Sequence, residues 1–144
     1  MPTMFVKKSF KPDLYAHIYN RGANKNEIFL IDADYHFFRE QARKLLEIFQ
    51  PSIELITYCL MPNHYHFLLY QRETYAISKF MHSLGTIYSM YFNKKYDHSG
   101  QLCQGPYKLA PLYSFEKIRK TEEYILRNPT KAGYESWEHV GWVI

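Results

Sequence analysis

Two histidines one residue apart, His64 and His66, have the clearest potential for chemistry in this sequence. They follow Pro62-Asn63 within the segment MPNHYHFLL, at the start of a run rich in aromatic and aliphatic residues that predicts a strand. Because side chains alternate along a strand, both imidazoles share one face, about 6.6 Å apart, and Tyr65 points to the other face. Two neutral imidazoles can bind one metal ion, although a third ligand is needed. The alternative is that they are ordinary half-buried histidines.

A second pair, Tyr124 and Asn128, lies in the segment EYILRNP near the end of the chain. On a helix, residues four apart are neighbours on one face. An Asn side-chain oxygen one turn from the tyrosine would complete a metal site of two imidazoles and one amide, leaving positions for water and a phosphate oxygen. The alternative is that Asn128 only ends the helix before Pro129.

Hydrophobic periodicity predicts the elements that must position these residues. Residues 14–20, 52–61, 64–71 and 107–113 are predicted strands, and the two-residue turn at Pro62-Asn63 makes the middle two an antiparallel hairpin. Helices are predicted from Asp32, a plausible N-cap, to Pro51, from Thr74 to about Tyr91, and from the N-cap Ser114 to just before Pro129. In the last helix, Phe115, Ile118 and Ile125 are expected to face the core.

The order β-α-β-β-α-β-α predicts an α+β fold, a ferredoxin-like antiparallel sheet with two helices on one face and an additional C-terminal helix. At 144 residues without repeats, the chain is expected to form a single domain, residues 1–144. Such folds host binding modules and enzymes alike, so the architecture does not predict a function.

Composition narrows the class of protein further. The N-terminal MPTMFVKKSFKPD lacks a secretory pattern and no segment is apolar enough to span a bilayer, so we expect a cytoplasmic protein without membrane contact. Cys59 and Cys103 lack metal-ligand spacing and are interpreted as structural. A net charge of +4 is compatible with a polyanionic partner, and an aromatic content of 18% is compatible with stacking on unpaired bases.

Four segments together resemble the HUH single-tyrosine transposases, and within them the REP-associated tyrosine transposases: YAHIYNRG, MPNHYHFLL, GQLCQGPYKL and YILRNPTKAG. The resemblance implies that His64, His66 and Asn128 bind Mg²⁺ or Mn²⁺ and that Tyr124 is the nucleophile. It also implies cleavage and rejoining of single-stranded DNA, or of hairpin or palindromic repeats, through a 5′-phosphotyrosine. Insertion-sequence relatives act as dimers that exchange the tyrosine helix, whereas the repeat-associated branch can act as a monomer, so a homodimer stays open.

Basic residues are candidates for contacts with DNA phosphates. Arg21 and Lys108 are favoured because their segments belong to the resemblance. The other candidates are Lys7, Lys8, Lys11, Lys25, Lys94, Lys95, Lys117, Arg119 and Lys120.

Three alternatives to a transposase remain on the sequence alone. The first is a non-catalytic nucleic-acid-binding module with the same fold, and the second is a protein in which zinc on the two histidines holds the fold together. The third is a relaxase or replication-initiator nickase, which the short chain and the lack of a second tyrosine near Tyr124 disfavour.

Overall fold

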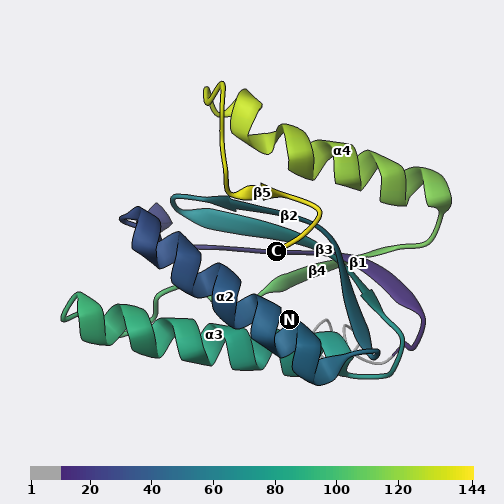
Figure 1. The fold of residues 1–144 in the computed structure, drawn as a ribbon, viewed down its shortest axis with the longest axis horizontal. Coiled ribbons are helices and arrows are strands. Elements are labelled where there is room, and N and C mark those ends of the chain that lie inside the picture. The colour runs from purple at the N-terminus through teal and green to yellow at the C-terminus, as the bar shows by residue number, and fades with distance from the viewer. Residues whose placement is uncertain (1–10) are drawn as a thin grey trace.

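A five-stranded antiparallel sheet forms the centre of the molecule (Figure 1). The computed structural model describes residues 11–144. The strand order is β4-β1-β3-β2-β5, and the first four strands in this order are those of the ferredoxin-like arrangement, so the predicted fold class is confirmed. The strands are β1 (Leu14–Arg21), β2 (Ile53–Met61), β3 (His64–Gln71), β4 (Lys108–Leu112) and β5 (Val140–Gly141).

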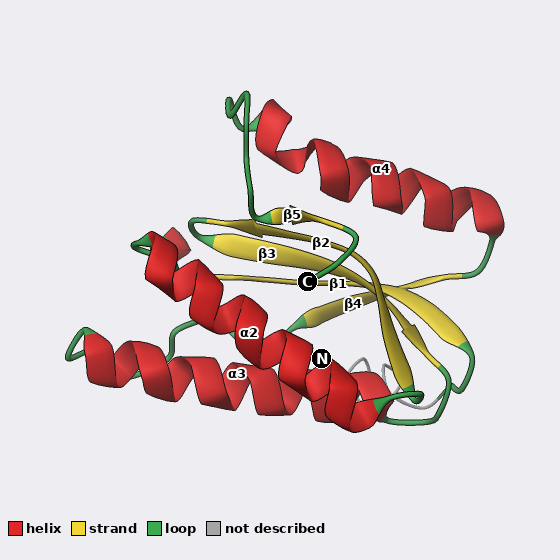
Figure 2. Ribbon diagram, viewed as in Figure 1, coloured by secondary structure: helices red, strands yellow, loops and turns green. Residues whose placement is uncertain are grey.

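Helices cover both faces of this sheet (Figure 2). Helices α2 and α3 lie side by side on one face, and α4 lies alone on the opposite face (Figure 1). Their bounds, with the short 3₁₀ turn η1, are η1 (Ala23–Lys25), α2 (Asp32–Phe49), α3 (Ala76–Lys95) and α4 (Phe115–Lys131). Within residues 11–144, no helix combines the length and the apolarity that crossing a bilayer requires.

The alternation of side chains along the strands divides the apolar residues into two clusters. The larger one packs the sheet against α2 and α3, and it includes Ile18, Tyr65, Phe67 and Ile77. The smaller one lies under α4, where the buried side chains are Cys59, Met61, Leu68 and Ile125. Tyr65 thus faces away from its two histidine neighbours, as predicted from strand period.

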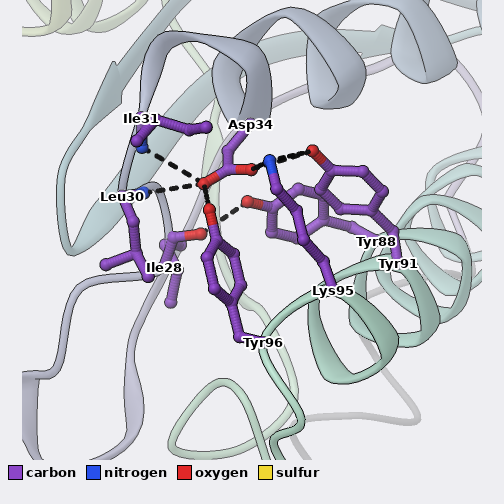
Figure 3. Close-up of polar contacts among 8 residues, drawn as sticks. All are labelled: Ile28, Leu30, Ile31, Asp34, Tyr88, Tyr91, Lys95 and Tyr96. Atoms are coloured by element: carbon purple, nitrogen blue, oxygen red, sulfur yellow. Dashed lines mark hydrogen bonds and ion pairs between the residues drawn. The ribbon is translucent and has the colours of Figure 1, made fainter.

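Asp34 joins the start of α2 to the end of α3 (Figure 3). Its carboxylate, fully buried, accepts hydrogen bonds from the backbone N–H groups of Leu30 and Ile31, from the hydroxyls of Tyr91 and Tyr96, and from Lys95 Nζ at 2.7 Å. Burial alone would raise the pKa of this carboxyl, but the donors led by Lys95 and Tyr96 outweigh it and lower the pKa to about 2.

The beginning of α2 differs from the sequence prediction. Asp32 is the first helical residue rather than the cap, and its side chain is exposed. Asp34, two residues further on, provides the carboxylate that accepts from the backbone before the helix, because it points inward to the donors of α3.

The C-terminal helix also departs from prediction at both ends. Ser114 caps it as expected, accepting from the backbone N–H of Lys117 at 3.1 Å. Phe115 is 80% exposed rather than in the core, since ten residues at about 100° each put it about 80° around the helix from the buried Ile125. Pro129 lies inside the helix, not after it, because its φ is helical and the chain continues to Lys131 before Ala132 bonds back to the Asn128 carbonyl.

Candidate active site on the face of the sheet under helix α4

The register of the sheet brings the predicted histidines onto the face that α4 covers. In the antiparallel pairing, Arg21 lies opposite His64 and Tyr19 lies opposite His66. Tyr19 also pairs with Lys108 on its other side, so Lys108 shares this face. Strand pairing therefore gathers residues far apart in sequence at one end of the sheet.

Helix α4 adds Tyr124 and Asn128 to this face. Ile125, fully buried, packs between α4 and the sheet, and the two polar residues flank it on the side of the histidines. His64 Nε2 lies 3.2 Å from Asn128 Oδ1. The ring of Tyr124 lies edge-on to the ring of His66, with centroids 5.6 Å apart.

All six residues predicted from the sequence line one open cavity of about 500 Å³. They are Arg21, His64, His66, Lys108, Tyr124 and Asn128. The sequence prediction thus identified residues that come together in space. Of the other basic candidates, Lys7 and Lys8 lie outside the described residues, and Lys95 is occupied with Asp34.

The loop after β1 fixes the turn that precedes the histidines. The backbone N–H of Gly22 donates to the Asn63 carbonyl at 2.8 Å. A Cβ on Gly22 would lie 2.0 Å from the carbonyl oxygen of Asn26, so only glycine permits this close approach. In return, the Asn63 amide nitrogen donates to the carbonyl of Lys25 at 3.2 Å, which turns the Asn63 side-chain oxygen towards His64.

The donor atoms of His64 and Asn128 suit a divalent cation. Asn63 Oδ1 lies 2.7 Å from His64 Nδ1 and can only accept, so Nδ1 carries the proton and neutral His64 presents a lone pair at Nε2. This lone pair faces the acceptor Oδ1 of Asn128 at 3.2 Å. Two ligand atoms about 2.1 Å from one ion at a right angle lie about 3.0 Å apart, so a cation fits the pair.

Burial keeps the imidazoles of the site in the neutral form that binds metals. It lowers the pKa of His66 to about 3, with His17 and His64 acting in the same direction. Burial also lowers the pKa of His64, aided by the nearby Arg21 guanidinium and opposed by the contact with Asn128. The pKa of His17 falls to about 4 because of its burial.

Two further residues lie beside the site: His17, to which the sequence assigned no role, and Lys131, which was not among the candidate phosphate contacts. His17 lies on β1 with its Nε2 2.9 Å from His66 Nδ1, and its ring lies 6.0 Å from that of Tyr124. Lys131 places its ammonium 5.6 Å from the centre of the Tyr124 ring. His17 falls within YAHIYNRG, where alternation on a predicted strand puts it on the face of Tyr15 and Tyr19, but no spacing rule links it to a histidine 49 residues away.

Another group of potential metal ligands lies elsewhere, where α2 begins and the C-terminal segment approaches it. Nε2 of the buried His139 is 3.5 Å from a carboxylate oxygen of Glu138 and 3.9 Å from one of Asp32. Both carboxylates are mostly exposed, and burial lowers the pKa of His139, so the imidazole is neutral at neutral pH and these contacts are not ion pairs. The group shares no residue with the site under α4.

Together, the fold and the site define an α+β domain with two histidines and a tyrosine on one face of its sheet. Comparison with known proteins assigns this domain to a family. The chain belongs to the IS200-like transposase family, since the model of that family, described as "Transposase IS200 like", matches residues 10–128. The predicted family resemblance is therefore confirmed. No curated protein matches the chain.

Two solved structures share the fold. One is a REP-associated tyrosine transposase bound to a REP hairpin, with a TM-score of 0.66, 15% identity, and coverage of 92% of this chain and 78% of that one. The other, from Deinococcus radiodurans R1 and described as a transposase, has a TM-score of 0.55 and 16% identity, with coverage of 88% of this chain and 95% of that one. At these identities the two structures are informative about the fold alone.

Proposed function

We propose that this transposase-family protein is a metal-dependent endonuclease and strand transferase for single-stranded DNA, with Tyr124 as its nucleophile. One observation carries the proposal. His64 Nε2 and Asn128 Oδ1 lie 3.2 Å apart as facing acceptors, and the Tyr124 ring is next to the second histidine, His66. Two imidazoles, an amide oxygen and a phenol at one cavity are a donor set for phosphoryl transfer rather than for structural zinc.

The proposed ligands of the ion, Mg²⁺ or Mn²⁺, are His64, His66 and Asn128. When bound, such an ion withdraws charge from the non-bridging oxygens of a phosphodiester and favours attack at phosphorus. The three side chains come from β3 and α4, two elements that pack on each other, so the protein itself holds the donors in place.

The Tyr124 side chain is 44% exposed, which leaves it open to a substrate. In the proposed step, its oxygen loses a proton to solvent or a base and forms a bond to phosphorus. The bond from phosphorus to the 3′ oxygen breaks, and that oxygen leaves with the electron pair and takes up a proton. The products are a 5′-phosphotyrosine and a free 3′-hydroxyl. Attack by another 3′-hydroxyl reverses the step and joins two DNA ends.

The DNA is proposed to enter the cavity beside Arg21 and Lys108, which line it with exposed cationic side chains. The REP-associated relative of the same fold was solved with a REP hairpin, and we extend this substrate class, a hairpin with a single-stranded flank, to the present chain. The exposed ring of Tyr19, 6.0 Å from that of His66, is available for stacking on an unpaired base.

The test is a search for the covalent intermediate. The protein is incubated with Mn²⁺ and a pool of DNA hairpins with randomised single-stranded flanks, and adducts are separated on denaturing gels. We expect an adduct whose tryptic peptide carries the nucleotide on Tyr124. Tyr124→Phe should abolish it while DNA binding persists, and the control Tyr113→Phe, at another exposed tyrosine, should leave it intact. Binding without any adduct would instead favour the non-catalytic module, and an adduct that survives Tyr124→Phe would place the nucleophile elsewhere.

A further inference from the structure

His17 contacts His66 on the face of the sheet that α4 covers. The two residues are diagonal neighbours on β1 and β3, because Tyr19 is the direct partner of His66 and Leu68 that of His17. Their rings are stacked, with centroids 5.1 Å apart and planes 26° apart. His17 Nε2 lies 2.9 Å from His66 Nδ1, which is a hydrogen bond between two imidazoles.

Only one proton can lie between these two nitrogens, and the nitrogen that carries it determines whether His66 can present a lone pair at Nε2. A neutral imidazole carries a hydrogen on one nitrogen and a lone pair on the other. If His17 donates, the lone pair of His66 at Nδ1 is consumed and its Nε2 carries hydrogen. If His66 donates from Nδ1 instead, its Nε2 presents a lone pair to the cavity.

His64, the other histidine of MPNHYHFLL, corresponds to the second case, with its hydrogen on Nδ1. His64 Nδ1 bonds to Asn63 Oδ1, an oxygen that can only accept, and Nε2 is thereby left with its lone pair. The two histidines of MPNHYHFLL therefore each have Nδ1 engaged by a neighbouring side chain, one by an amide and the other by an imidazole.

We propose that His17 is a positioning residue that accepts the Nδ1 proton of His66 and so fixes the tautomer whose Nε2 binds the metal. The inference rests on the proposed role of His66 as a ligand. Metal-binding histidines generally have the second ring nitrogen bonded to a partner that sets tautomer and ring orientation. Here that partner is His17 on the neighbouring strand, and His17 is not itself proposed as a ligand of the metal.

Two substitutions at position 17 separate the hydrogen bond from simple packing. His17→Phe keeps a flat ring on the sheet but removes the acceptor. His17→Gln restores an acceptor oxygen near the place of Nε2. Tyr15→Phe, two residues earlier on the same face, is the matched control, since Tyr15 packs on Tyr70 away from the site.

Mn²⁺ affinity without DNA, followed by electron paramagnetic resonance of the free ion, is the first readout. We expect His17→Phe to weaken binding about 10- to 100-fold, as loss of a partner behind a ligand does, with His17→Gln and Tyr15→Phe close to wild type. Binding in His17→Phe equal to that of wild type, while His64→Ala abolishes it, would overturn the role of His17 alone. Binding unaffected by His64→Ala would overturn the proposed metal site itself.

Long-range ¹H–¹⁵N spectra of the metal-free protein provide the second readout, which a purely structural role would not move. We expect His66 to carry its hydrogen on Nδ1 in wild type and in His17→Gln, and to redistribute it between the ring nitrogens in His17→Phe. A wild-type His66 with hydrogen on Nε2 and a bare Nδ1 would overturn the inference.

Discussion

Replacement of Ile125 by alanine tests whether the packing of α4 positions the nucleophile. Ile125 is fully buried against the sheet, and besides Pro129 it is the only buried residue of α4. The substitution removes three carbons, which costs about 2.4 kcal/mol at about 0.8 kcal/mol per methylene, within a range of about 2–5 kcal/mol once the cavity is included.

The matched control is Ile77→Ala, the same substitution at a fully buried residue of α3 on the opposite face of the sheet. Both variants should lose comparable free energy of unfolding. Only Ile125→Ala should favour detachment of α4 from the sheet, by about 50-fold in the equilibrium constant for a loss of about 2.4 kcal/mol.

Native-state hydrogen exchange measures this detachment residue by residue. We expect the amides of α4 to lose about 50-fold in protection in Ile125→Ala, and the yield of the covalent DNA adduct to fall more than in Ile77→Ala. Equal loss of α4 protection in the two variants would refute the reasoning, because α4 would then open only with the whole domain.

Three other predictions concern the arrangement of the chain, acid stability and DNA binding. Because α4 packs on its own sheet, mixing Tyr124→Phe with His64→Ala protein should restore no adduct, whereas exchange of α4 between subunits would restore up to about a quarter of the sites. Folding lowers the pKa of Asp34 from 3.8 to about 2, so its ionisation should contribute about 2 kcal/mol to the free energy of unfolding above pH 4, and roughly half of that should be lost by pH 3. The free energies of unfolding of wild type and Asp34→Asn, measured by urea titration, should therefore converge as the pH falls. A difference between them that does not change with pH would contradict this origin. Arg21→Ala should weaken DNA binding and make the slope of log affinity against log salt concentration shallower by about 0.7, because one phosphate contact is lost. Lys44→Ala on α2 should change neither the affinity nor the slope. Equal effects of the two substitutions would argue against a contact between Arg21 and DNA at the cavity.

Local patterns in the sequence predicted most of the elements, and these patterns together with the family resemblance named six residues that line one cavity, whose roles are proposals. The strand with His64 and His66 begins and ends where predicted, because a two-residue turn and strict alternation specify both its start and its faces. The spacing of Tyr124 and Asn128 predicted that they would share a helix face, which the site geometry uses. Errors fell at helix ends, at Asp32, Phe115 and Pro129, because contacts with neighbours in space decide where a helix begins and ends and which of its terminal residues are buried.

The sequence by itself determined the alternation of strands and helices, the faces on which the histidines lie, and the family to which the chain belongs. Only the tertiary structure decided that α4 lies on its own sheet with Asn128 next to His64, and that His17 bonds to His66 across two strands. The physical reason is that strand register and helix docking depend on how side chains from distant segments pack together, which no local period encodes.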